Sequence, residues 1–169
     1  MEQKVENKIE LKDKLISFYY KNKLKIYLFF SVLVIVLIST TFIKINIEKK
    51  NSQIAEKYIK ANLLLTSGKK ENSKKIYEEI ILSKNKFYSV LSLNTLIEKK
   101  LETNKDIILD YFKIVENLNH SGANLDLIIL KKALFLNKNS EIKNSNDLLK
   151  KLINKDSKLK KIAEDLIVK

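Results

Sequence analysis

A run of eighteen residues without a charged side chain, from Ile26 to Ile43, constrains this chain more than any other feature. Lys25 precedes the run and Lys44 follows it. An α-helix rises about 1.5 Å per residue, so the run would extend roughly 27 Å, close to the hydrocarbon thickness of a bilayer. A buried helix of a soluble protein normally has one polar face, and this run has none through Leu37. The sequence therefore predicts a transmembrane helix over Ile26–Ile43.

The apolar run is typical of an uncleaved signal-anchor. A cleaved secretory signal has an apolar core of about 7–15 residues followed by a small-x-small cleavage site. Here a leader, residues 1–25, precedes a longer run, and no Ala-x-Ala sequence follows it. Ser39-Thr40-Thr41 is a poor substitute for such a site. We therefore expect the leader and the apolar helix to remain in the mature chain.

The distribution of lysines bears on orientation only weakly. Five lysines lie between Glu10 and Lys25, and four lie between Lys44 and Ile59, so the positive-inside rule barely distinguishes the two sides. Long domains translocate largely regardless of their charge. We therefore expect residues 1–25 on the cytoplasmic side of the membrane and residues 44–169 on the opposite side. The alternative is a domain that faces the cytosol.

The composition after the apolar run favours an all-α domain. The chain contains no Pro and no Cys, and its only glycines are Gly68 and Gly122. A sheet protein of this length usually needs more turn glycines and prolines, so helices joined by short polar turns are expected. Without cysteine there is no disulfide framework and no thiolate metal site.

The positive charge does not indicate a nucleic-acid ligand. The net charge is +13, but all 33 basic residues are lysine, and arginine is the usual reader of guanine and phosphate. After Ile43 the 26 lysines exceed the 16 acidic residues by 10, and they are spread throughout the domain. Contact between lysines and anionic lipid headgroups is the more plausible role, because the anchor holds the domain near the membrane.

Apolar residues after the anchor recur at helical spacing. The pattern predicts seven segments, which are Ile54–Ser67, Glu71–Leu82, Phe87–Lys100, Ile107–Leu118, Leu125–Leu136, a short one around Leu148–Leu152, and one that begins at Asp156 or Ser157. Helix pairs of this size suggest a repeat array, for which the tetratricopeptide unit of about 34 residues is a candidate.

Several residues fit the characteristic positions of the tetratricopeptide unit. Gly68 stands at the turn, and the packing positions around it are held by Ala61, Leu64, Ser73 and Tyr77. Phe112 follows Tyr77 by 35 residues, but Leu96 and Ile108 occupy the small-residue positions of the second unit, and Leu148 with Ala133 makes a third. The expected fold is a tetratricopeptide-like α-solenoid of about three hairpins plus a terminal helix, with an irregular helical bundle as the alternative.

This arrangement resembles the YfgM-type proteins, ancillary subunits of the SecYEG translocon. The resemblance rests on the anchor Ile26–Ile43, the hairpin Ala61–Ile80 and the following segment Asn85–Lys100. It implies a non-catalytic protein that binds other proteins at the translocon or among periplasmic chaperones. Two alternatives remain, which are a scaffold of another envelope process such as cell division, and a cytosol-facing adaptor.

The sequence offers no catalytic or metal-binding constellation. The lone histidine, His120, is expected in a solvated loop, and neither G-x-S-x-G, H-E-x-x-H nor C-x-x-C occurs. The acidic pairs Glu78-Glu79 and Glu164-Asp165 stand near lysines and are expected to be solvated. We therefore predict no enzyme, no cofactor and no bound metal.

A partner is expected on the concave face of the array. In stacked hairpins the first helix of each pair lines that face, which predicts Ile54–Ser67, Phe87–Lys100 and Leu125–Leu136 as its walls. Tyr58, Tyr88 and Asn94 are the candidate contacts, and burial in the core is the alternative for both tyrosines. The last helix either caps the domain or presents an apolar strip to a partner, through Leu159, Ile162, Leu166 and Ile167.

Overall fold

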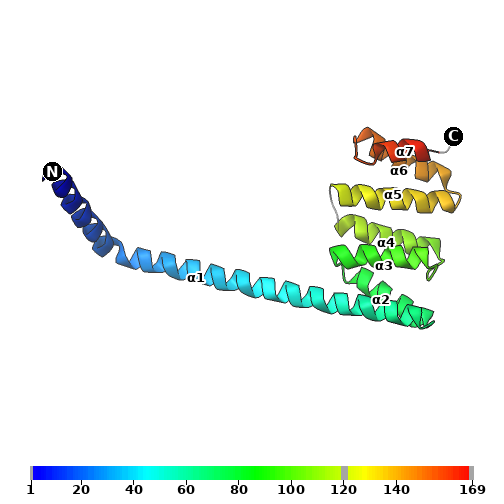
Figure 1. Cartoon of the computed structure of the whole chain (residues 1–169), viewed down its shortest axis with the longest axis horizontal. Helices are drawn as coiled ribbons and strands as arrows, with labels where there is room; N and C mark the ends of the chain where they lie inside the picture. The colour runs from blue at the N-terminus through cyan, green and yellow to red at the C-terminus, as the bar shows by residue number, and fades with distance from the viewer. Residues whose placement is uncertain (1, 119–121, 168–169) are drawn as a thin grey trace. The chain divides into compact units, whose positions relative to one another are not determined.

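A computed structural model describes the backbone of residues 2–118 and 122–167, and their side chains except those of residues 2–13, 15 and 26. Every regular element in these ranges is an α-helix, which confirms the all-α class for the described part of the chain (Figure 1). The helices are α1 (Glu2–Thr66), α2 (Lys70–Leu82), α3 (Lys86–Glu98), α4 (Lys105–Leu118), α5 (Ala123–Lys138), α6 (Ile142–Asn154) and α7 (Lys160–Leu166). His120 lies outside the described residues.

Helix α1 is one continuous element of 65 residues. The sequence predicted separate helices over Ile26–Ile43 and Ile54–Ser67, but the residues between them are helical too. Residues 44–53 contain neither Pro nor Gly, so nothing in them breaks a helix. By its contacts the chain divides into a unit of residues 1–50 and a unit of residues 51–169. The change of composition after Ile43 is therefore not a break in the helix.

The apolar part of α1 has the properties of a membrane span. An eighteen-residue window within Tyr27–Thr66 has a mean hydropathy of 2.4, and none of it is buried. Three of its hydroxyl groups bond to the helix's own backbone. Ser31 donates to the carbonyl oxygen of Leu28 at 2.8 Å, and Thr40 and Thr41 donate to that of Leu37 at 2.9 and 2.8 Å. These polar groups are satisfied without water, as a lipid environment requires. The helix is long and apolar enough to cross a bilayer.

In the second unit each helix from α2 to α7 packs against the next one along the chain (Figure 1). The end of α1 joins this stack through α2, where the hydroxyl of Tyr77 donates to Asn62 Oδ1 at 2.8 Å. Most buried apolar side chains form one cluster, which consists of Ala61, Tyr77, Ile80, Ile81, Leu93, Leu96, Leu101, Ile108, Phe112, Val115 and Ile128. A second cluster consists of Leu130, Ala133, Leu149, Leu152 and Ala163. Helix α5 contributes to both clusters.

One packing contact recurs at two places in the stack. The hydroxyl of Ser73 donates to the carbonyl oxygen of Ala61, and that of Ser145 donates to the carbonyl oxygen of Ala133. Each hydrogen bond is 2.8 Å long and joins residues that are twelve apart in the sequence. All four residues are buried. Small side chains here let α1 approach α2 and let α5 approach α6 closely.

The hairpin of α3 and α4 lacks this small pair. Leu96 and Ile108, again twelve residues apart, occupy the corresponding positions as buried apolar side chains. Phe112 follows Ile108 by four residues, as Tyr77 follows Ser73. In the third hairpin the residue four after Ser145 is Leu149, which is buried, whereas the predicted counterpart Leu148 is only partly buried. The predicted register of the third hairpin was therefore wrong by one residue.

The turns between helices use left-handed residues. Gly68 and Gly122 have φ angles of 78° and 80°, but Lys84, Lys100, Ser140 and Asp156 also have positive φ, between 51° and 62°. After α3, for example, Leu101 N donates to the carbonyl oxygen of Leu96 at 2.9 Å and Lys100 N donates to that of Ile97 at 3.2 Å. This pair of bonds is the Schellman arrangement, which needs a left-handed residue at its centre. Four of these six left-handed positions are occupied by a residue other than glycine.

The last helix packs mainly as a cap. Leu159, Leu166 and Ile167 are partly buried against the second cluster, and Ala163 belongs to it. Ile162 is exposed. These contacts agree with the capping alternative for α7 and leave Ile162 facing solvent.

Candidate functional site

A groove lies between α3 and α5 and consists of two adjoining cavities of about 330 and 290 Å³. Asn94 lines both cavities. The other lining residues of α3 are Lys86, Phe87, Val90, Leu91, Ile97 and Glu98, and α5 contributes Asn124, Leu127, Ile128, Lys131, Leu134, Phe135 and Lys138. In each set, single residues or adjacent pairs recur once per helical turn, so the set occupies one helix face. We call this site the α3/α5 groove.

The walls of the α3/α5 groove expose large apolar side chains. Phe87 on α3 is 64% exposed, and Leu127 and Leu134 on α5 are each 43% exposed. Helix α5 buries Ile128 in one core cluster and Leu130 in the other, so Leu127 and Leu134 are left on a third face. Apolar groups gathered in a hollow, rather than scattered singly, mark a binding surface.

Local sequence fixes where α3 begins. The side chain of Asn85 caps this helix, because its Oδ1 accepts hydrogen bonds from Phe87 N at 3.1 Å and Tyr88 N at 2.9 Å. Its Nδ2 also donates to Asn51 Oδ1 of α1 at 2.8 Å. One asparagine thus ends the preceding turn and ties the start of the groove to α1.

A buried carboxylate holds the loop between α3 and α4. Glu102 accepts from Thr103 N at 2.7 Å and Asn104 N at 2.6 Å, and it pairs with Lys74 Nζ of α2 at 2.8 Å. Burial opposes ionisation of Glu102, but the hydrogen bonds from Lys74, Asn104 and Thr103 outweigh it and keep the pKa of this carboxyl below its ordinary value. This bonding ties the loop between α3 and α4 to α2.

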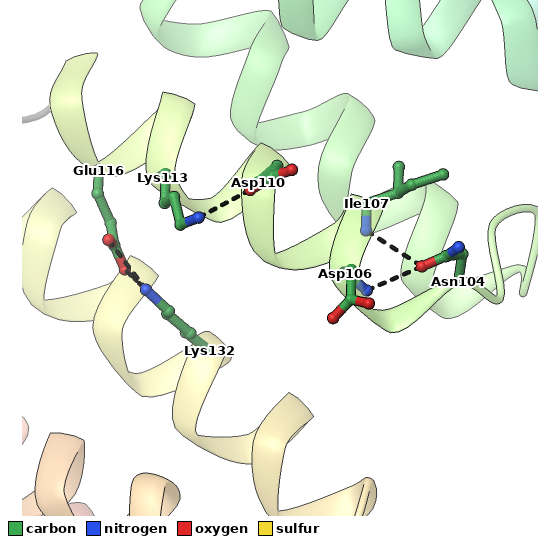
Figure 2. Close-up of polar contacts among 7 residues, drawn as sticks. All are labelled: Asn104, Asp106, Ile107, Asp110, Lys113, Glu116 and Lys132. Carbon is green, nitrogen blue, oxygen red and sulfur yellow. Dashed lines mark hydrogen bonds and ion pairs between the residues drawn. The ribbon is translucent and has the colours of Figure 1, made fainter.

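Helices α4 and α5 are joined by an ion pair that is visible in Figure 2. Lys132 Nζ lies 2.9 Å from Glu116 Oε1 and 3.1 Å from Oε2, and both side chains are partly buried. At the other end of α4, Asn104 Oδ1 caps the helix by accepting from the backbone nitrogens of Asp106 and Ile107 (Figure 2). Helix α4 contacts both α3 and α5, and the ion pair holds one groove wall, α5, against α4.

A second buried carboxylate fixes the start of α5. Asp126 accepts from Lys155 Nζ at 2.8 Å and from the Ser157 hydroxyl at 2.6 Å, which ties α5 to the turn before α7. The hydrogen bonds from Lys155 and Ser157 hold the pKa of Asp126 below its ordinary value, although burial opposes them.

The three candidate contact residues do not lie in one site. Asn94 lies in the α3/α5 groove, but Tyr58 and Tyr88 line neither cavity. The ring of Tyr58 lies 5.7 Å from that of Tyr77 and 5.6 Å from that of Tyr88, and both Tyr58 and Tyr88 pack against the first core cluster. Their position matches the core alternative. Their rings join α1, α2 and α3.

The six residues predicted to support repeat packing lie at helix contacts or turns. Tyr77 and Phe112 are among the largest fully buried side chains, and Ala61 and Ser73 form the hydrogen bond described above. Leu64 is partly buried and its carbonyl oxygen accepts from Lys69 N at 2.9 Å beside the left-handed Gly68.

Acidic side chains do not cluster in the groove, where Glu98 is the only carboxylate among the lining residues. Among the described residues no three His, Asp or Glu side chains are placed to hold a metal ion. Of the acidic pairs, Glu79 contacts Lys57 at 2.9 Å on the surface, Glu78 lies 4.0 Å from Lys74, and Glu164 and Asp165 are exposed. The arrangement of the α3/α5 groove suits binding through apolar contact and charge.

Sequence reasoning missed the groove's exposed apolar residues. Phe87, Leu127 and Leu134 were all assigned to helices, but spacing did not distinguish them from core residues. A signal was present in α5, because apolar residues occur on every side of this helix (Leu125, Leu127, Ile128, Ile129, Leu130, Leu134, Phe135 and Leu136). A helix of that kind must either be surrounded or leave one apolar face open.

Comparisons with protein families, with curated proteins and with solved structures found no match to this chain. Function is therefore inferred from the helix α1 and the α3/α5 groove.

Proposed function

We propose that this chain is a single-pass membrane protein whose helical domain binds other proteins in the α3/α5 groove. The observation that carries the proposal is the exposure of Phe87, Leu127 and Leu134 along one hollow. Burying such side chains against a partner stabilises a complex by about 25 cal/mol per Å² of apolar surface, before the costs of association. The apolar section of α1 supports the membrane assignment.

The proposed architecture is a tetratricopeptide-like solenoid. Support comes from the contact of Ser73 with Ala61 and its recurrence at Ser145 and Ala133. The intervening position, Leu96, follows Ala61 by 35 residues and precedes Ala133 by 37, close to the repeat length of such arrays. In this architecture α3 and α5 are first helices of successive pairs, so the groove belongs to the concave face.

The proposed location is the inner membrane of a bacterium, with the leader in the cytoplasm and the domain in the periplasm. Partners at the SecYEG translocon or among periplasmic chaperones are proposed from the resemblance to the YfgM-type proteins. The proposal includes no catalysis, because the proposed activity is the binding of another protein between α3 and α5.

Site-specific photo-crosslinking in native membranes tests this function. A photoreactive amino acid replaces Asn94 in the groove, and the same amino acid replaces Lys113 on α4 as the control, since Lys113 is exposed and lies outside the groove. We expect a discrete protein adduct from position 94 and none of the same size from position 113. Absence of any protein adduct at 94, in a chain that is folded and membrane-bound, would contradict the proposed function.

A further inference from the structure

The two cavities of the α3/α5 groove have a defined spacing. Leu127 lines the cavity of about 330 Å³ and Leu134 lines the cavity of about 290 Å³. Because these residues are seven apart on α5, they lie about 10 Å apart along the helix axis. A ligand that fills both cavities must therefore place two apolar side chains at that separation.

The groove is also cationic. Its lining includes Lys86, Lys131 and Lys138 but only one acidic residue, Glu98. Lys131 stands between Leu127 and Leu134 in sequence, one helical turn from each, and lines the second cavity. A positive groove attracts acidic segments and disfavours basic ones.

The polar lining argues for a helical ligand. Asn94 and Asn124 are the only amide side chains among the residues that line the two cavities. An extended segment would bring a row of unpaired backbone groups into a largely apolar hollow, where unsatisfied groups are costly. A helix satisfies its own backbone and presents only side chains.

We propose, on the premise that the groove binds protein, that its ligand is an acidic amphipathic helix. Two apolar side chains seven residues apart fill the cavities around Leu127 and Leu134. A carboxylate three or four residues after the first apolar side chain lies between them and pairs with Lys131. The apolar contacts supply most of the affinity, and the lysines select acidic over basic segments.

The test uses the full chain in nanodiscs of phosphatidylcholine, which carries no net charge. The probe is a fluorescent helical peptide with two leucines seven apart and glutamates between and beside them, and a matched peptide carries lysines in place of the glutamates. Fluorescence anisotropy at low salt should show the acidic peptide binding about tenfold more tightly. Equal affinity for the two peptides would overturn the proposal.

Variants locate the binding. We expect Lys131→Glu and Leu134→Ser each to weaken binding of the acidic peptide about tenfold. The control Lys113→Glu makes the same charge change on α4, outside the groove, and should leave the affinity within about twofold. Unchanged affinity in Lys131→Glu, with an unchanged circular-dichroism spectrum, would overturn the assignment.

Two further results distinguish a wrong ligand from a wrong groove function. If the chain self-associates in nanodiscs and Leu134→Ser abolishes that association, the occupant is a second copy and the acidic ligand is refuted. If position 94 still crosslinks to a protein in native membranes but the acidic peptide does not bind, the groove function stands and its ligand chemistry is wrong. Loss of both signals overturns the function as well.

Discussion

The hydroxyl of Ser145 donates a 2.8 Å hydrogen bond to the carbonyl oxygen of Ala133, and both residues are buried. This contact requires α5 and α6 to lie close together, and that approach depends on the small side chain at position 133. We expect Ala133→Leu to reduce the free energy of unfolding by about 1–3 kcal/mol, since the added atoms have no space. Ala123→Leu, at the exposed start of α5, is the matched control. Equal thermal midpoints for the two variants would show that close approach is not required.

The left-handed conformation of Lys100 predicts a stabilising glycine substitution. Its φ angle is 51°, whereas the adjacent Lys99 has a φ angle of −89°. A side chain at positive φ costs roughly 1–2 kcal/mol, so Lys100→Gly should raise the free energy of unfolding by about 0.5–1 kcal/mol after the entropy cost of glycine. Lys99→Gly removes the same charge but relieves no strain, and should be destabilising. Thermal denaturation of both variants measures the contrast, and a shift of the same sign in both would contradict it.

The buried carboxylate of Asp126 predicts a pH dependence of stability. Its folded pKa lies below its ordinary value of 3.8, so its contribution is present above that pH and is lost as the pH falls through the lower folded pKa. We expect Asp126→Asn to lower the free energy of unfolding at neutral pH and to weaken its dependence on pH below about 4. Asp147→Asn, at an exposed position on α6, makes the same substitution and is the matched control. Identical slopes in wild type and Asp126→Asn would rule out the effect.

The apolar section of α1 predicts firm membrane retention. We expect the chain to remain in the pellet after a carbonate wash and to keep its N-terminus. Ile35→Lys places a charge near the centre of the span and should impair insertion, since such a charge costs about 2.5–3.5 kcal/mol. Ile59→Lys, after the span, should not affect retention. Recovery of a mature chain that begins after Thr41 would refute the anchor.

Tyr58 and Asn94 lie in different surroundings, so we expect truncation of Tyr58 to affect stability and truncation of Asn94 to affect peptide binding. Tyr58→Ala removes a ring packed between Tyr77 and Tyr88, and should reduce the free energy of unfolding by about 1–3 kcal/mol. Asn94→Ala removes a side chain that lines the groove and should change stability little, but it should weaken peptide binding. Thermal denaturation and anisotropy separate the two roles. A destabilisation by Asn94→Ala as large as that by Tyr58→Ala would argue against a free groove.

The assignment of helices could be made from the sequence because it depends on local features. Seven apolar segments at helical spacing, without Pro, each overlap a helix of the structure, although α1 also runs through residues 44–53 and the last helix begins at Lys160 rather than at Asp156 or Ser157. The same applies to the uncharged run Ile26–Ile43, whose length and composition suit a membrane and need no tertiary contact to be recognised. Gly68 likewise marked a turn, since its positive φ is a local property.

The register of the third hairpin could not be determined in this way. Leu148 and Leu149 are both apolar and adjacent, so a repeat of variable length fits either one. The choice depends on where α6 rests against α5, which the contact between Ser145 and Ala133 settles in favour of Leu149.

The sequence by itself determined that this chain is helical and carries one segment suited to a membrane, because charge, apolar spacing and the absence of Pro act within a few turns of chain. Only the tertiary structure decided which apolar faces are covered. Tyr58 and Tyr88 pack together because α1 and α3 meet at their rings, whereas Leu127 and Leu134 remain open because α4, between α3 and α5, holds those helices apart. Spacing places a side chain on a face of its helix, but its exposure depends on the neighbouring helix.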